Sequence, residues 1–257
     1  ALYSQFDSKR TKIVATVGPS SNTPEKIRAM IHAGVNVFRI NFSHGNHETH
    51  GAVIDLIRQL VDEEGVVAAI LCDIQGPKIR IGTVANEPLP LTPGQRITFT
   101  TQKVPGENGL ISLPHPEFLQ DIKAGMKLLL DDGNIEMVVR QVIPNGMVAE
   151  VVNGRELKSR KGVSAPQAEV SLSAITSKDR DDIEFALSKG ADFIAMSFVR
   201  TAEDIRQLRW LMLHLNGEAA VIAKIEKPQA LINIQDIIDV SDGIMVARGD
   251  LGIETPA

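Results

Sequence analysis

Hydrophobic positions in the first part of the chain follow two periods. Runs rich in apolar and β-branched residues, which favour strands, occupy residues 12–17, 35–43 and 66–73. The last run, VVAAILCD, is apolar almost throughout, as expected of a parallel strand covered on both faces. Between the runs, residues 23–34 and 46–65 carry helix signals and helical periodicity. The order predicts strand, helix, strand, helix, strand.

The pattern changes between about residues 78 and 170, where no long segment has helical periodicity. Short apolar runs are separated there by the sequences DDGN and PNG, in which Asp-Gly and Asn-Gly are signals for hairpin turns. Further Pro and Gly residues punctuate the same stretch. This segment is predicted to be a small all-β module inserted into an α/β repeat.

Helix and strand alternation returns after the module. Helices are predicted at 177–190, 201–217 and 228–240, and strands at 191–199, 219–226 and 243–248. The two parts of the repeat together supply six strands.

Polar residues gather where these six strands end. In parallel α/β folds ligands bind at the carboxyl ends of strands, so the pattern favours a (β/α)₈ barrel. Six strands are not eight, and a doubly wound open sheet is the alternative that periodicity leaves open. The polar strand-end residues are Thr16, Arg39, Asn41, Ser43, Asp73, Ser197, Lys224, Glu226, Arg248 and Asp250.

Composition narrows the class of protein without indicating its chemistry. The 257 residues carry a formal net charge of -5, whereas nucleic-acid-binding domains are usually basic. Cys72 is the single cysteine, so no internal disulfide can form and a reducing compartment is expected. No apolar run approaches the ~20 residues that span a bilayer, and the first residues lack a signal-peptide core. We therefore expect a cytoplasmic protein that binds neither membrane nor nucleic acid.

The sequence AKIEKP places Lys224 and Glu226 two residues apart, on one face of a strand. A simple ion pair at the end of the strand is the commoner reading of such a pair. With Asp250 at the end of the next strand, the two carboxylates would suit Mg²⁺, which keeps positions for substrate oxygens. Lys224 would then stabilise negative charge that develops during a reaction.

Two further stretches offer groups for binding phosphate or a cation. In FRINFSHG, Arg39 suits a phosphate, and Asn41 and Ser43 offer oxygen ligands to a hard cation beside Asp73. The basic stretch around Lys161 reads either as a solvated hairpin or as a contact for nucleotide phosphates. Neither a GxxxxGK[ST] phosphate loop nor a kinase glycine-rich loop is present.

Taken together, the motifs resemble those of the pyruvate kinase family, in the same order and over essentially the whole chain. They are RTKIVATVGPSS, VFRINFSHG, CDIQGPKIRIG, SRKGV, AKIEKPQAL and DGIMVARGDLGIE. The resemblance implies transfer of the phosphoryl group of phosphoenolpyruvate to ADP, giving ATP and pyruvate in the last step of glycolysis.

The resemblance also assigns roles to the residues that bind the substrate. Glu226 and Asp250 resemble the carboxylates that bind Mg²⁺ or Mn²⁺, and Lys224 resembles the lysine that stabilises the transition state and the enolate. Gly249 and Asp250 resemble the backbone site for the substrate carboxylate. Arg39 resembles the arginine that contacts the transferred phosphate.

The nucleotide and K⁺ sites follow from the same resemblance. Asn41, Ser43, His44, Arg80 and Lys161 resemble nucleotide-contacting positions. The K⁺ site of the family is resembled by four groups of this chain: the side chains of Asn41, Ser43 and Asp73 and the backbone carbonyl of Ile74.

One position near the K⁺ site departs from the family pattern. Members that need K⁺ carry Glu where this chain has Lys78. Our hypothesis is that the Lys78 ammonium supplies the charge that K⁺ supplies elsewhere.

The resemblance also implies the domain organisation. Residues 1–77 and 171–257 would form the A domain, a (β/α)₈ barrel of which six strands are present, and residues 78–170 the β-rich B domain that acts as a lid. The full-length enzyme would be a homotetramer. Two alternatives stay open: a non-catalytic Mg²⁺-binding fragment of that enzyme, and another phosphoenolpyruvate- or pyruvate-handling barrel.

Overall fold

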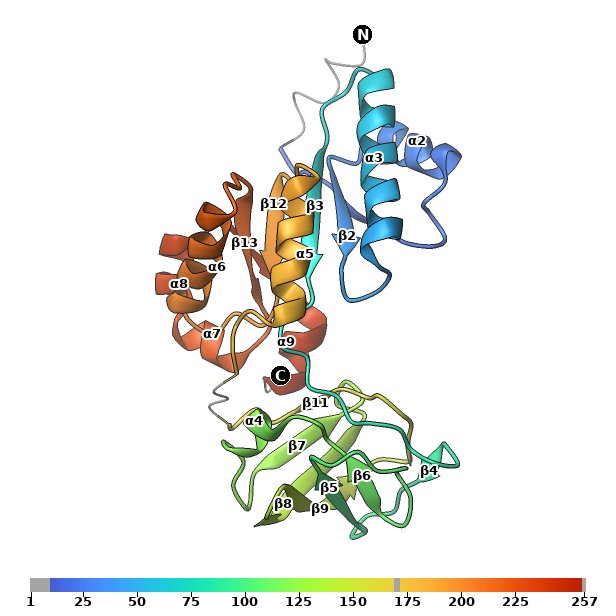
Figure 1. Ribbon diagram of the computed structural model, residues 1–257, viewed down its shortest axis with the longest axis vertical. Coiled ribbons are helices and arrows are strands. Elements are labelled where there is room, and N and C mark those ends of the chain that lie inside the picture. The colour runs from blue at the N-terminus through green and yellow to red at the C-terminus, as the bar shows by residue number, and fades with distance from the viewer. Residues whose placement is uncertain (1–9, 169–171, 256–257) are drawn as a thin grey trace. The chain divides into compact units, whose positions relative to one another are not determined.

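A computed structural model describes residues 10–168 and 172–255 (Figure 1). The predicted domain boundary at residues 170 and 171 lies outside these ranges. Within them, no helix is long and apolar enough to cross a bilayer. The chain divides into two compact units, the first formed by Ala1–Gly76 and Ala174–Val246 and the second by Pro77–Ser173 and Ala247–Ala257.

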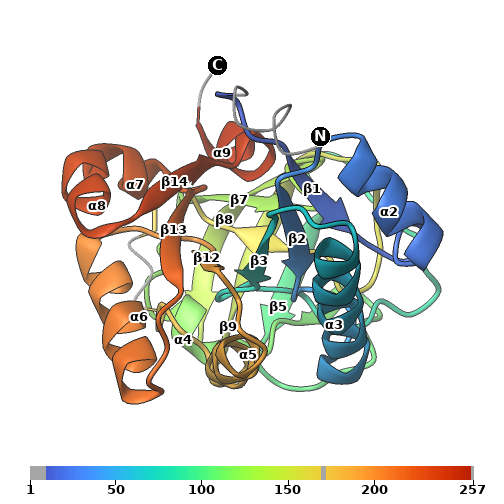
Figure 2. The same cartoon turned by 90° about the horizontal axis from the view of Figure 1, so that it is seen from above.

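The first unit is an α/β fold built on one parallel sheet. Its six strands lie side by side in the order β1-β2-β3-β12-β13-β14, and every neighbouring pair is parallel. Seen from above, the sheet is curled rather than flat (Figure 2). The strands are β1 (Val14–Val17), β2 (Val37–Asn41), β3 (Ala69–Ile74), β12 (Phe193–Met196), β13 (Ala220–Ile225) and β14 (Gly243–Val246).

Helices cover the outer, convex side of this sheet (Figure 2). The predicted apolar stripe of the helix between β2 and β3 faces inward, with Ile54, Ile57 and Leu60 buried. The helices are α2 (Pro24–His32), α3 (His47–Glu63), α5 (Ser177–Ser188), α6 (Ala202–His214), α7 (Pro228–Ile232) and α8 (Ile234–Val240).

Side-chain caps fix where these helices begin. Thr23 caps α2 by accepting a hydrogen bond from the backbone of Lys26, and proline follows at the first helical position. Asn46, Thr176 and Thr201 each form a capping box with the residue three positions later. Two of these helices, α3 and α6, therefore begin directly after segments that carry site residues.

The prediction of one helix over 228–240 is wrong, because the structure has two short helices there. Asn233 interrupts the helix with φ of -102° and ψ of 18°. Its side-chain amide donates to the carbonyl oxygens of Gln229 and Arg200, both at 3.0 Å. An asparagine that bonds neighbouring carbonyl groups competes with regular helical bonding.

The second unit is β-rich. Its main sheet has six strands in the order β11-β7-β8-β9-β5-β6, and β4 pairs with β10. All neighbours in the main sheet are antiparallel except β5 and β6, which are parallel. The elements are β4 (Leu89–Pro90), β5 (Arg96–Thr100), β6 (Leu110–Ser112), α4 (Pro116–Leu119), β7 (Lys127–Leu130), β8 (Ile135–Ile143), β9 (Gly146–Asn153), β10 (Glu156–Leu157), β11 (Val163–Ser164) and α9 (Arg248–Glu254).

Both hairpin turns predicted from Asp-Gly and Asn-Gly are present. The β7–β8 turn has positive φ at Asp131, Asp132 and Gly133, and the β8–β9 turn has φ of 57° at Asn145. Gly146 is required for a different reason: a Cβ atom there would lie 2.2 Å from the Phe99 carbonyl oxygen on the neighbouring strand. The turns hold the strands over a separate hydrophobic core.

Cys72 offers a test of how tightly the first unit is packed. It lies on β3 with none of its surface exposed, and burial raises the pKa of its thiol to about 12. At pH 8 we expect no reaction with Ellman's reagent in the native protein and one thiol per chain in urea. Rapid stoichiometric reaction without denaturant would show that β3 is accessible.

Candidate active site

Charged and polar side chains meet at the carboxyl ends of the strands in the first unit. Asn41 at the end of β2 is the register partner of Asp73 on β3, and Asp73 is also the partner of Ala195 on β12. Lys224 lies near the end of β13, and Glu226 follows that strand directly. The sheet thus brings together residues from four strands that are far apart in sequence.

Asp73 links the two cations of this group. One carboxylate oxygen accepts the Nε–H of Arg39 at 2.7 Å, and the other lies 3.1 Å from Nζ of Lys224. Arg39 also donates to the hydroxyl oxygen of Thr16 at 2.8 Å, which connects the group to β1. Asp73 is only 1% exposed, so its charge needs these partners.

The Lys224 ammonium group contacts three oxygens. They belong to Ser197 at 2.8 Å, Glu226 at 3.0 Å and Asp73 at 3.1 Å. The simple ion pair of Lys224 and Glu226 considered from the sequence is therefore present, but it is part of a larger buried network. Lysine has three N–H donors, so the three contacts hold its position from three sides.

Two residues after β12 hold this network in place. The Ser197 hydroxyl donates to the Ile74 carbonyl oxygen at 2.6 Å, and the Phe198 N–H donates to the Glu226 carboxylate at 2.7 Å. Phe198 has φ of 55°, which is strained for a bulky side chain and is typical of functional sites. The sequence indicated Ser197 only as a polar strand end and gave no signal for Phe198.

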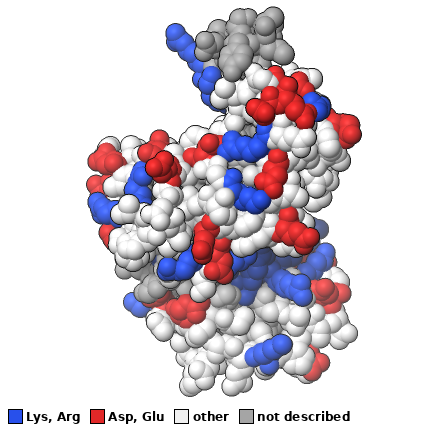
Figure 3. Space-filling view, turned by 45° about the horizontal axis from the view of Figure 1, so that its top comes forward, with Lys and Arg blue, Asp and Glu red and all other residues white. Residues whose placement is uncertain are grey.

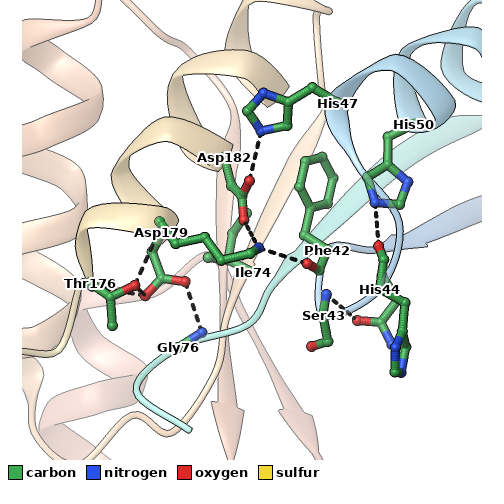
Figure 4. A network of polar contacts seen from close by, with 12 residues as sticks. Phe42, Ser43, His44, His47, His50, Ile74, Gly76, Thr176, Asp179 and Asp182 are labelled. Carbon is green, nitrogen blue, oxygen red and sulfur yellow. Dashed lines mark hydrogen bonds and ion pairs between the residues drawn. The ribbon is translucent and has the colours of Figure 1, made fainter. Parts of the chain in front are cut away.

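Three of the predicted nucleotide-contacting residues are Asn41, at the end of β2, and Ser43 and His44 in the loop that follows (Figure 4 shows the last two). The Asn41 side chain accepts the Ser43 N–H at 3.0 Å, and the His44 carbonyl oxygen lies 2.6 Å from Nε2 of His50. Burial lowers the pKa of His50 and favours its neutral ring, whose Nε2–H donates in this contact. The loop is therefore fixed at both of these positions.

The second unit groups the remaining basic candidates. Arg80 and Gly162 form an antiparallel bridge, so the segments around Lys78 and Lys161 run side by side. The Lys161 ammonium lies 2.5 Å from a carboxylate oxygen of Asp131. Lys and Arg side chains gather in one patch on the face of the molecule seen in Figure 3.

Gly249 and Asp250 lie in the first turn of α9, which belongs to the second unit, whereas Glu226 belongs to the first. Among the described residues, no group of three or more His, Cys, Asp or Glu side chains is arranged to hold a metal. A magnesium site can instead use two carboxylates and complete its shell with substrate oxygens. The buried carboxylate of Glu226 fits that requirement in its chemistry.

Comparison with known proteins identifies the family. Residues 8–257 match the family model described as "Pyruvate kinase, barrel domain". The chain belongs to the pyruvate kinase family. The resemblance drawn from the sequence motifs is thereby confirmed.

Several bacterial pyruvate kinases are similar to this chain. One from Agrobacterium vitis is 47% identical over 251 residues, which are 97% of this chain and 52% of that protein. Another, from Methylorubrum extorquens, is 45% identical over 249 residues, again 97% and 52%. A third, from Geobacillus stearothermophilus, is 43% identical over 252 residues, 97% and 43%. The chain thus spans about half the length of these pyruvate kinases.

From this network we predict that the ion pairs of Asp73 with Arg39 and Lys224 stabilise the fold. Replacing Asp73 by Ala leaves Arg39 and Lys224 without their shared anion, so we expect a loss of about 3 kcal/mol in the free energy of unfolding. The matched control is Asp55→Ala, which removes an exposed ion pair with Lys189 and should cost less than about 1 kcal/mol. Urea unfolding measures both; equal losses would contradict a buried role for Asp73.

Proposed function

We propose that the protein is a phosphotransferase that moves the phosphoryl group of phosphoenolpyruvate to ADP and produces ATP and pyruvate, the last step of glycolysis. The observation that carries this proposal is the Lys224 ammonium group, held between Ser197, Asp73 and Glu226 at the carboxyl end of the sheet. Membership of the pyruvate kinase family supports it. The activity is proposed for the intact protein.

A divalent ion, Mg²⁺ or Mn²⁺, fits this chemistry, with Glu226 and Asp250 as its protein ligands. When bound, the ion supplies positive charge to oxygens of the substrate. Glu226 is oriented by the backbone N–H of Phe198, which leaves its carboxylate in one position. The backbone of Gly249 and Asp250 would bind the substrate carboxylate.

Lys224 would act on the oxygen through which the phosphoryl group leaves. The bond between phosphorus and that oxygen breaks while a new bond forms to a terminal phosphate oxygen of ADP. Negative charge then appears on the enolate oxygen, and a fixed ammonium group stabilises it without reorganisation of solvent. Uptake of a proton at the terminal carbon of the enolate completes pyruvate.

The remaining candidates would hold phosphate and nucleotide. Arg39, fixed by Asp73 and Thr16, would contact the phosphoryl group in transit. Asn41, Ser43 and His44 would contact the nucleotide from the first unit. Arg80 and Lys161 would reach it from the second unit, where the bridge between Arg80 and Gly162 brings their segments side by side.

The domain organisation proposed here is that of the family. Residues 1–77 and 171–257 would belong to an A domain with the (β/α)₈ barrel architecture, and residues 78–170 to a B domain that closes over the substrates. We further propose a homotetramer that works in the cytoplasm.

Lys78 is proposed to replace the monovalent ion that many members require. The K⁺ ligands would otherwise be Asn41, Ser43, Asp73 and the carbonyl of Ile74. In this chain the Asp73 carboxylate already has two cationic partners. A lysine ammonium supplies one positive charge, as K⁺ does.

The role of Lys224 is tested by the variant Lys224→Met. We expect phosphoryl transfer to fall by at least about 10²-fold to 10³-fold, because the fixed charge on the leaving oxygen is lost. Binding of Mn²⁺, measured by titration calorimetry, should persist because both carboxylates remain. The control is Lys189→Met, at the C-cap of α5, where Lys189 pairs with exposed Asp55.

A coupled assay with phosphoenolpyruvate and ADP gives the readout. Activity retained in Lys224→Met would remove this residue from its proposed role. Absence of ADP-dependent transfer in the unaltered intact protein would overturn the proposed function as a whole.

The K⁺ hypothesis is tested by changing Lys78. The unaltered protein should be active in buffer free of Na⁺ and K⁺, with a tetraalkylammonium salt keeping the ionic strength constant. The Lys78→Glu variant should become dependent on K⁺, because the fixed positive charge is replaced by a negative one. Equally strong K⁺ activation of both proteins would contradict the hypothesis.

A further inference from the structure

The first turn of α5 is tied to the loop that follows β2. The Lys178 ammonium donates to the Phe42 carbonyl oxygen at 2.9 Å and lies 2.5 Å from a carboxylate oxygen of Asp182. The second oxygen of Asp182 lies 2.7 Å from Nε2 of His47, at the start of α3. Figure 4 shows this arrangement between the two helices. One lysine and one carboxylate thus connect α5 to both ends of the loop.

Within the loop, Phe42 is the residue that Lys178 contacts. Its N–H donates to the Asp73 carbonyl oxygen at 2.9 Å, while its own carbonyl oxygen accepts from Lys178. The ring is 2% exposed and lies 4.6 Å from the ring of His50, centroid to centroid. The Phe42 peptide is therefore held by β3 on one side and by α5 on the other.

Phe42 lies directly between the residues proposed to contact the nucleotide. Asn41 precedes it, and Ser43 and His44 follow it. Since Asn41 accepts the Ser43 N–H across Phe42, a rotation of the Phe42 peptide would move both of these side chains. The carbonyl contact of Lys178 therefore bears on the geometry of the whole loop.

The same helical turn is anchored at its other side. Asp179, 1% exposed, accepts the Gly76 N–H at 3.0 Å and the Thr176 hydroxyl at 2.7 Å. Lys178 thus projects from a turn that is itself fixed to the end of β3. A fixed support is what a positioning residue needs.

Because the Lys178 side chain is exposed, we expect it to position the loop and to contribute little to the stability of the fold. Its side chain is 52% exposed, and ion pairs of exposed lysines contribute little to folding. The carboxylate that holds it is 5% exposed, so the direction of the lysine is nevertheless well defined. Its removal should therefore alter the loop more than the stability of the fold.

We propose that Lys178, held by Asp182, is a positioning residue for the nucleotide-contacting loop 41–44. It acts through the Phe42 carbonyl oxygen and touches neither substrate. This proposal rests on the proposed function, because the loop matters only if a nucleotide binds there. Its signature is a selective effect on ADP, since phosphoenolpyruvate is assigned to Lys224 and Arg39.

The decisive experiment compares Lys178 of α5 with Lys189, the C-cap residue of the same helix, in the intact protein. Lys178→Met should raise the KM for ADP about 5-fold to 10-fold, with the KM for phosphoenolpyruvate and the kcat at saturating ADP changed less than about 2-fold. Lys189→Met is the matched control, because Lys189 likewise pairs with an aspartate, but with Asp55 of α3 instead of Asp182 beside the loop. It should leave the KM for ADP unchanged. Lys178→Arg, which can donate to both oxygens, should restore most of the affinity.

A second variant covers the case in which Lys178→Met folds poorly. Asp182→Asn keeps the side-chain volume, removes the charge that holds Lys178, and should produce the same selective rise in the KM for ADP. Thermal unfolding of every variant separates a loss of fold from a loss of position.

Three outcomes would overturn the proposal. An unchanged KM for ADP in folded Lys178→Met would remove the positioning role, and so would an equal rise in Lys189→Met. A rise in the KM for ADP that only tracks a fall in thermal stability would assign Lys178 to the fold. If the unaltered protein neither transfers phosphate nor binds Mg²⁺-ADP in calorimetry, the proposed function fails first and this proposal with it.

Discussion

Asp73 is shared by two cations at the carboxyl end of the sheet, Arg39 on one oxygen and Lys224 on the other. Without this carboxylate, two positive side chains would face each other with little water to screen them. With it, β2, β3 and β13 are joined at the level where substrates are proposed to bind. Buried charges of this kind require nearly complete pairing, so the positions of Arg39, Lys224 and Glu226 depend on one another.

A strained backbone conformation at Phe198 supports these ion pairs. Phe198 adopts a left-handed conformation, and in that conformation its N–H points to the carboxylate of Glu226. Ser197, one residue earlier, serves both Lys224 and the Ile74 carbonyl oxygen. Two adjacent residues therefore orient a lysine and a glutamate, and the strain at Phe198 accompanies that arrangement.

Much of this architecture could be predicted from the sequence because it follows from local rules. Strand periodicity placed Lys224 and Glu226 on one face, and Asn-Gly at residue 145 predicted its hairpin turn. The contacts of Asp73 could not be predicted, because they join strands that are distant in sequence. The break at Asn233 was missed for a similar reason, since one of its amide partners is the carbonyl of Arg200 on another segment.

The capping box of α5 bears on how the inserted segment between Gly76 and Ala174 can change in evolution. The chain leaves the first unit at Gly76 and re-enters it at Ala174, and Asp179 binds both the Gly76 N–H and the Thr176 hydroxyl. The ends of the insertion are therefore held together by the first unit itself, and the entropy of closing so long a loop grows only slowly with its length. Evolution can lengthen, shorten or redesign the insertion while the parallel sheet of the first unit keeps the same shape.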